Sequence, residues 1–150
     1  MKVLVLGAGA VGTVSALKFV QDAMLEKLVI ADAVSARASL LADRLNDPRV
    51  SAIGLDAADG AAVARSIRET GTTIVLNAAL PWTNLDVMRA CLDAGCDYID
   101  LASGGSDDDG IPKLEDQFAM DREFKAAGRL ALLGMGADPG MSNVYAAYAA

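Results

Sequence analysis

The chain has 150 residues, 53% of them hydrophobic, a formal net charge of −7 and no histidine. An acidic surface argues against nucleic acid or an anionic membrane as partner, and the missing histidine excludes a histidine base or ligand within the chain. The length suits one domain with one core. No apolar run approaches the ~18 residues of a membrane span, and the glycine-interrupted apolar start lacks a signal-peptide cleavage site. We therefore expect a cytoplasmic protein.

Strand and helix patterns alternate along the whole chain. A strand over 3–6 leads into a glycine turn and a helix whose apolar positions are Val14, Leu17 and Val20. Further strands are predicted over 27–31, 50–55, 73–76, 97–101 and 130–133, and further helices over 35–45, 60–69, 83–94, 114–127 and from 141 onwards. This alternation predicts an α/β fold, a parallel sheet with helices on both faces. Right-handed crossovers favour the doubly wound Rossmann order 3-2-1-4-5-6.

The turn after the first strand carries Gly7, Gly9 and Gly12 in the G-x-G-x-x-G spacing of dinucleotide-binding folds. Gly7 would let the chain leave the strand, Gly9 would let the backbone approach a pyrophosphate, and Gly12 would let the helix pack closely. The helix N-terminus would add free N–H groups and partial positive charge. Asp32 lies 20 residues after Gly12, where a carboxylate accepts hydrogen bonds from a ribose. The alternative is a Rossmann-like fold that binds no nucleotide.

The other candidate residues also follow predicted strands, at the edge of the sheet where such folds bind ligands. Asp56 and Asn77 have two interpretations of equal weight, because acids and amides at strand ends also start turns through their own backbone. In the helix at 83–94, Thr83 and Asp86 have a spacing similar to a capping box.

Three acids and two cysteines suggest no metal site. Asp107, Asp108 and Asp109 lack the spacing of an EF-hand, so a solvated loop is favoured over a cation site. Cys91 and Cys96 do not form a C-x-x-C motif and are expected to be buried thiols in a reducing compartment.

Five segments together resemble the saccharopine dehydrogenase-like family, which includes saccharopine reductases, lysine dehydrogenases and relatives of carboxynorspermidine synthase. They are LGAGAVG (6–12), LD (55–56), NAALP (77–81), AGCDYID (94–100) and LGMGADPG (133–140). The aliphatic-Pro-aromatic turn at 80–82 and the Asp-Pro-Gly at 138–140 are the most specific to the family. In that family a Rossmann domain precedes a second domain that supplies much of the substrate pocket and the dimer contact. We expect this chain to hold only the first domain, because its final helical pattern lacks a cap.

The resemblance also implies roles for individual residues. The pyrophosphate would lie against Ala8, Gly9, Ala10 and Val11, with Asp32 at the ribose and Asp56 near the adenine. On the nicotinamide side would lie Leu80, Pro81 and Ser103, with Asn77 as a further candidate and with Trp82 and Asp138 beside the substrate. No general acid or base is assigned.

The resemblance further implies a reaction and a cofactor. NADP-using saccharopine reductases share an arginine just after the second strand, where this chain has Asp32, with Arg37 one helical turn further on. A carboxylate would repel a 2′-phosphate, so NAD(H) is the expected cofactor. The expected enzyme is a homodimeric oxidoreductase that moves hydride between the nicotinamide and the nitrogen-bearing carbon of an amino acid or opine-type secondary amine. The rival is a regulatory module of the potassium-channel regulator type, which binds NAD(H) or adenine nucleotides without chemistry.

Overall fold

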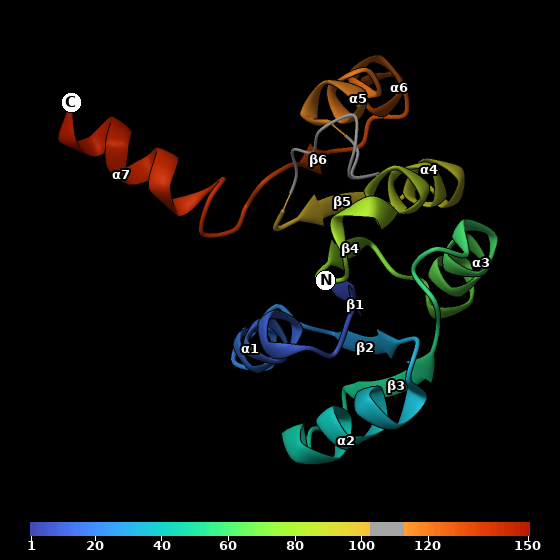
Figure 1. The fold of residues 1–150 in the computed structure, drawn as a ribbon. Helices are drawn as coiled ribbons and strands as arrows, with labels where there is room; N and C mark the ends of the chain where they lie inside the picture. The colour runs from blue at the N-terminus through green and yellow to red at the C-terminus, as the bar shows by residue number, and fades with distance from the viewer. Residues whose placement is uncertain (103–112) are drawn as a thin grey trace.

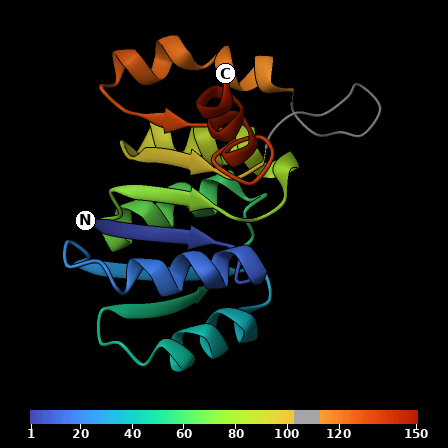
Figure 2. The same ribbon diagram turned by 90° about the vertical axis from the view of Figure 1, so that its left-hand side faces the viewer.

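The computed structural model describes residues 1–102 and 113–150, and in these residues the chain forms a six-stranded parallel sheet in the order β3-β2-β1-β4-β5-β6 (Figure 1). The strands are β1 (Lys2–Leu6), β2 (Lys27–Asp32), β3 (Val50–Gly54), β4 (Ile74–Asn77), β5 (Asp97–Asp100) and β6 (Ala131–Leu132). Each lies within one residue of its predicted bounds, and the doubly wound order is confirmed. Figure 2 shows that all the strands run the same way, so that their carboxyl ends share one edge.

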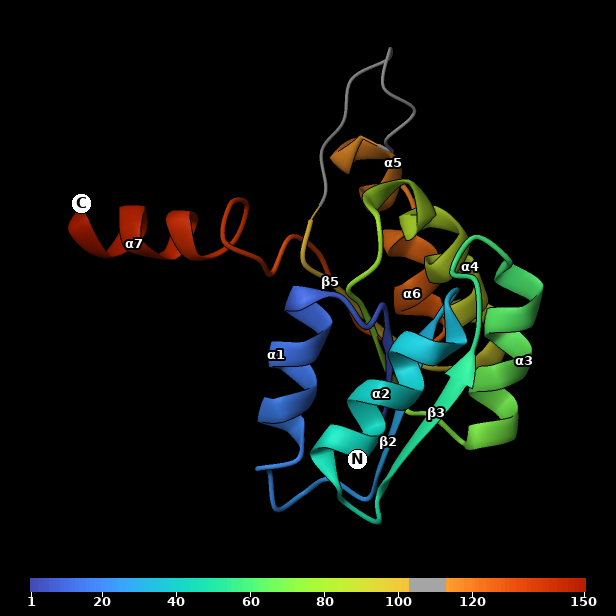
Figure 3. The same ribbon diagram turned by 60° about the horizontal axis from the view of Figure 1, so that its bottom comes forward.

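Helices cover both faces of this sheet. The helices of the described residues are α1 (Ala10–Phe19), α2 (Ser35–Leu45), α3 (Gly60–Thr70), α4 (Asn84–Ala94), α5 (Leu114–Phe118), α6 (Asp121–Ala126) and α7 (Met141–Ala149), with a 3₁₀ turn η1 (Pro81–Thr83). α7 has no buried residue and extends away from the sheet (Figure 1). α1 and α2 lie on one face, and α3, α4 and α6 lie on the other (Figure 3). Among the described residues, no helix has both the length and the apolar character needed to cross a membrane.

Two apolar cores explain why the central strands are continuous runs of apolar residues. β1 and β2 are buried on both sides, as is usual for a parallel sheet with helices on both faces. Val3 and Val5 pack toward α1 and α2, whereas Leu4 and Leu6 pack toward α3 and α4. Alternate residues of one strand therefore hold the two helical layers against the sheet.

Helix α1 packs on the sheet largely through small residues, which contradicts the predicted apolar stripe at Val14 and Leu17, whereas Val20, the third predicted position, is partly buried against the core. Val14 is 58% exposed and Leu17 is 45% exposed, while Gly12 and Ala16 are buried. The close approach of α1 to the chain at Gly7 explains the difference, because only a residue without a side chain fits at position 12. Helical periodicity does not report how near a helix lies to its sheet.

Two predicted helices begin or continue differently in the structure. The helix predicted over 114–127 is interrupted between α5 and α6. The capping box predicted at Thr83 and Asp86 is absent, since Thr83 has no capping hydrogen bond and its hydroxyl donates to the carbonyl of Leu80 at 2.8 Å. The chain enters α4 through η1 instead, with Pro81 at the start of that turn.

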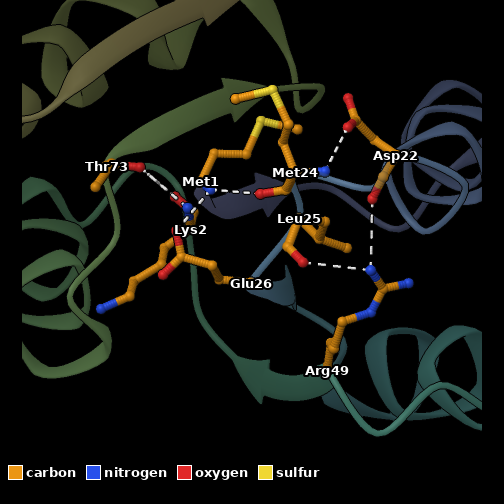
Figure 4. A network of polar contacts seen from close by, with 8 residues as sticks. All are labelled: Met1, Lys2, Asp22, Met24, Leu25, Glu26, Arg49 and Thr73. Carbon is orange, nitrogen blue, oxygen red and sulfur yellow. Dashed lines mark hydrogen bonds and ion pairs between the residues drawn. The ribbon is translucent and has the colours of Figure 1, made fainter.

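The amino-terminal edge of the sheet is fastened by polar contacts (Figure 4). The N-terminal ammonium donates to the Met24 carbonyl at 2.6 Å and to Glu26 Oε1 at 2.9 Å. The hydrogen bond and charge of that ammonium lower the pKa of Glu26. Arg49 donates to Asp47 at 2.7 Å and to the carbonyls of Val20, Asp22 and Leu25, joining the segment after α1 to the start of β3. This edge lies opposite the strand ends that carry the candidate site.

Candidate functional site

A cleft of about 470 Å³ opens at the carboxyl ends of β1, β2, β3 and β4. It is lined by Leu6, Gly7, Gly9, Asp32, Ala33, Val34, Arg37, Leu55, Asp56, Ala57, Ala58, Ala78, Ala79, Leu80, Trp82 and Thr83. Six of the predicted site residues are therefore brought together here, namely Gly7, Gly9, Asp32, Asp56, Leu80 and Trp82. The two sides of the cleft come from the first and the second half of the sheet, where the strand order reverses.

The local structure requires glycine at two of the three positions of the first turn. Gly7 has φ +100°, a left-handed conformation that favours glycine. A Cβ on Gly12 would lie 1.8 Å from the Gly7 carbonyl oxygen, so α1 can approach the turn only with glycine there. A Cβ on Gly9 would meet no protein atom within 4 Å and would project into open space. Nothing within the described chain therefore demands glycine at position 9, and the space beside it is open to a bound group.

The N-terminus of α1 faces this turn with its first-turn N–H groups available. Gly9 is the N-cap and supplies no side-chain cap, and the first N–H groups of a helix have no partner within the helix. Ala10 and Val11, the first two helical residues, are exposed. Together with the helix dipole, these N–H groups form an anion-binding end of the kind that holds a pyrophosphate.

Asp32 connects the glycine turn to the chain that follows β2. Its Oδ2 accepts a hydrogen bond from the Ala8 N–H at 2.9 Å, and its Oδ1 accepts one from the Val34 N–H at 2.8 Å. The residue is only 9% exposed, yet it lines the cleft. Since each carboxylate oxygen can accept more than one hydrogen bond, Asp32 can fix the turn and still accept from a ligand hydroxyl.

Asp56 and Arg37 line the adjoining part of the cleft. Asp56 is exposed and uses Oδ1 to accept from the Ala58 N–H at 3.0 Å, so its turn-forming interpretation is confirmed while its position leaves it open to a ligand. Arg37 lies on the first turns of α2, exposed, and contributes a cation to a cleft that otherwise holds two carboxylates.

The far side of the cleft is formed by the turn between β4 and α4. Leu80 and Trp82 are about half exposed, at 54% and 51%, and Pro81 lies between them. Asn77 is buried beneath this turn, where its Oδ1 accepts from the Ala79 N–H and its Nδ2 donates to Thr83 Oγ1 and Asn84 Oδ1. The backbone role proposed for Asn77 is confirmed, and its contact with a nicotinamide stays a prediction.

Several predicted residues are not brought to this cleft. Ala8, Ala10, Val11, Gly12, Asn77 and Pro81 do not line it, although Ala8, Ala10, Asn77 and Pro81 are each next in the chain to a residue that does. Asp138 lies outside the lining and accepts a hydrogen bond from Ser142 Oγ at 2.8 Å. Ser103 and Asp107, Asp108 and Asp109 fall outside the described residues. In residues 1–102 and 113–150, no group of three or more His, Cys, Asp or Glu side chains could hold a metal ion.

A buried polar cluster that the sequence pattern did not predict lies beside the cleft. Asp100 is 0% exposed, and its carboxylate accepts from Tyr98 OH at 3.0 Å, Gln117 Nε2 at 2.7 Å and the Gly134 N–H at 2.6 Å. Burial raises the pKa of Asp100, and these three donors oppose the rise. Burial, with the nearby Asp100 carboxylate, also raises the pKa of Tyr98. The available signal was an acid at the end of β5, but nothing in the spacing identified Gln117 as its partner.

Three comparisons with known proteins agree with this geometry. A family model described as the saccharopine dehydrogenase NADP binding domain matches residues 3–132. The chain is 36% identical over 148 residues to carboxyaminopropylagmatine dehydrogenase of Synechocystis, covering 99% of this chain and 37% of that protein. It is 33% identical over 166 residues to carboxynorspermidine synthase of Vibrio cholerae, covering 100% of this chain and 39% of that protein.

A solved structure shows the same fold. Saccharopine dehydrogenase (L-Glu forming) of Saccharomyces cerevisiae superposes with a TM-score of 0.79 at 21% identity, over 97% of this chain and 29% of that one. The chain thus spans well under half the length of these relatives. With the family model matching most of its length, the chain belongs to the saccharopine dehydrogenase family of oxidoreductases, as the Rossmann domain that binds the nicotinamide dinucleotide.

Proposed function

We propose that this domain serves an NAD(H)-dependent oxidoreductase that acts on the C–N bond of an amino acid or opine-type secondary amine. The observation that carries the proposal is the open space at Gly9, beside the N-terminus of α1 and within reach of a cleft that contains Asp32. A pyrophosphate needs close backbone approach and free N–H groups, and the ribose next to it needs an acceptor.

Each predicted residue takes a place along the extended dinucleotide. The N–H groups of the first turn of α1 bind the pyrophosphate, with Ala8, Ala10 and Val11 shaping the loop around it. Asp32 accepts from the adenosine ribose, and Asp56 lies near the adenine. The cofactor, when bound, supplies the hydride chemistry. Towards the nicotinamide lie Leu80, Pro81 and Asn77, and Trp82 and Asp138 lie beside the substrate; Ser103, which the resemblance assigns to the nicotinamide side, falls outside the described residues.

The preference for NAD(H) over NADP(H) rests on Asp32. A carboxylate already held by two backbone N–H groups cannot turn away from a 2′-phosphate, and it would repel that group. The matched family model is described as an NADP binding domain, and Arg37 offers a cation in the same cleft. The charge at position 32 is therefore the feature to test.

Substrate and assembly are proposed from the relatives. Carboxyaminopropylagmatine dehydrogenase and carboxynorspermidine synthase are both named for carboxylated amines, which supports a substrate with a carboxylate near the reacting C–N bond. We propose that a second domain completes the substrate site and the homodimer contact, and that the enzyme works in the cytoplasm, where its two free buried thiols stay reduced. The reported relatives are enzymes, and none of them supports the rival regulatory module.

Calorimetric titration with NADH and NADPH tests the cofactor assignment. Wild type should bind NADH more tightly, and Asp32→Asn should shift the ratio of the two dissociation constants toward NADPH by about tenfold. Asp43→Asn is the matched control, because Asp43 is an exposed acid on α2 that does not line the cleft. Tighter NADPH binding by wild type would refute the role given to Asp32.

A parallel assay tests where catalysis resides. The 150-residue chain should bind NADH without measurable turnover of carboxynorspermidine, saccharopine or lysine, because half a site cannot hold both reactants in near-attack geometry. Turnover equal to that of an intact family member would refute the two-domain proposal.

A further inference from the structure

Two segments flank the side of the sheet assigned to nicotinamide and substrate. One is the turn over residues 78–83, which lines the cleft through Leu80 and Trp82. The other is the segment over 134–140 after β6, which contains Asp138. They come from strands that are not neighbours, because β5 lies between β4 and β6 in the sheet. Their relative position therefore depends on what joins them across β5.

The first half of that connection is a chain of buried amides. Asn77 Nδ2 donates to Asn84 Oδ1 at 3.0 Å, and Asn84 Nδ2 donates to the Ala102 carbonyl at 2.8 Å and to Gln117 Oε1 at 3.5 Å. Asn77 also donates to Thr83 Oγ1 at 3.1 Å, and the Thr83 hydroxyl in turn donates to the Leu80 carbonyl at 2.8 Å. The turn over residues 78–83 is thus held in place by hydrogen bonds from side chains that are almost wholly buried.

The second half is centred on Asp100. Gln117 Nε2 donates to Asp100 Oδ2 at 2.7 Å, and Asp100 Oδ1 accepts from the Gly134 N–H at 2.6 Å. The Asp100 carbonyl also accepts from the Met135 N–H at 2.9 Å. A Cβ on Gly136 would lie 2.0 Å from the Leu101 carbonyl oxygen, so the segment presses directly on the end of β5. Three successive residues after β6 are fixed by this one strand end.

The connection consists of buried polar side chains, including one carboxylate, where a core is usually apolar. Within the described residues, no Lys or Arg forms an ion pair with Asp100. A buried carboxylate of this kind is costly unless every donor around it is well placed. An apolar core would stabilise the fold at least as well, but it would not fix two backbone segments at hydrogen-bonding distances.

We propose that the buried network of Asn77, Thr83, Asn84, Gln117, Tyr98 and Asp100 positions the Leu80–Trp82 turn relative to the 134–140 segment, and so shapes the nicotinamide side of the site. Asp100 is a positioning residue because it accepts from the Gly134 N–H, and Gln117 is one because it joins Asp100 to Asn84. The inference rests on the proposed function for the identity of the ligand, but the placement of Trp82 can be measured without one.

The decisive pair of variants is Asp100→Asn and the double variant Asp100→Asn with Gln117→Glu. The single change leaves an amide where the carboxylate accepted from three donors, so at least one donor loses its acceptor. The double change returns a carboxylate at position 117, which accepts from the new amide and from Asn84. Thr72→Val is the control. Thr72 is buried, its hydroxyl forms a hydrogen bond of 2.7 Å with the Thr70 hydroxyl, and it precedes the start of β4, at the end of that strand away from the cleft.

Two readouts separate positioning from stability. The first is the ratio of the dissociation constants for NADH and ADP-ribose, since ADP-ribose lacks only the nicotinamide. The second is iodide quenching of Trp82, the single tryptophan of the chain, in the free protein. In Asp100→Asn we expect the NADH constant to rise about fivefold or more, ADP-ribose to change less than about twofold, and the quenching of Trp82 to change. The double variant should restore both readouts, and Thr72→Val should alter neither.

The contrary results are equally definite. A lower urea midpoint for Asp100→Asn with an unchanged ratio and unchanged Trp82 quenching would make the network merely structural and overturn the inference. Equal weakening of NADH and ADP-ribose would overturn it as well. If wild type bound neither ligand, the proposed function would fail, and unchanged Trp82 quenching in Asp100→Asn would then overturn the positioning role independently.

Discussion

Gly12 lies so close to Gly7 that a Cβ at position 12 would stand 1.8 Å from the Gly7 carbonyl oxygen. Gly9, between them in the same motif, has no protein atom within 4 Å of the place where its Cβ would be. The two glycines therefore answer to different demands. Gly12 serves the packing of α1 on the turn, whereas the open space at Gly9 is the place that we propose for the pyrophosphate.

Alanine substitution separates these demands. Gly9→Ala should leave the free energy of unfolding within about 0.5 kcal/mol of wild type, because Gly9 has φ −76° and open space. It should weaken NADH binding about tenfold or more, since the new methyl group occupies the place of the pyrophosphate. Gly12→Ala should cost about 1–3 kcal/mol or more through overpacking. Urea unfolding and calorimetry measure both effects, and normal NADH affinity in Gly9→Ala would contradict the assignment.

The sheet was predictable because its signals are local and mutually consistent. Apolar runs such as those of β1 and β2 alternate with helical spacing, and the handedness of crossovers leaves one strand order. The convergence of Asp32, Asp56 and Leu80 on one cleft follows from that order, because the strand ends share an edge. The sequence is therefore sufficient to predict which residues lie at the carboxyl ends of the strands.

Contacts that depend on distance between elements were not predictable. Val14 and Leu17 have helical spacing but point outward, because the separation of α1 from the sheet is set by Gly12 against Gly7. Asp100 and Gln117 are 17 residues apart in the sequence, and no periodicity relates them. Asp138, placed beside the substrate by resemblance, lies outside the cleft lining in this chain.

Acid should weaken the ion pair between Arg49 and Asp47 at the amino-terminal edge of the sheet. The hydrogen bonds from Arg49 lower the pKa of Asp47 to about 2, below the ~3.9 of an unfolded aspartate. A depressed folded-state pKa gives stability that is present above about pH 4 and is lost as the pH falls toward 2. The difference between the urea midpoints of wild type and Arg49→Gln should therefore become smaller as the pH is lowered from 5 to about 2.5. A difference that stays constant over this range would show that Asp47 contributes nothing to it.

The two cysteines should report global unfolding. Cys91 and Cys96 are free and have no exposed surface. The adjacent Cys96 thiol and burial raise the pKa of Cys91 well above its usual range, so little thiolate forms. We expect neither thiol to react with a disulfide reagent in the folded protein, and both to react in urea at the rate of opening. Rapid modification of either thiol in native buffer would contradict the packing of α4 and β5.

Arg37 should account for the weaker, residual binding of NADPH that we expect beside Asp32. It is exposed and lines the cleft with Asp32, so its guanidinium can pair with a 2′-phosphate but has no such partner on NADH. Arg37→Ala should raise the NADPH dissociation constant about tenfold, and the NADH constant should change less than about twofold. Arg44→Ala is the control, because Arg44 is an exposed arginine in the last turn of α2 and does not line the cleft. Calorimetry with both cofactors measures the change. An equal loss for NADH and NADPH would mean that Arg37 contacts a part of the dinucleotide common to both.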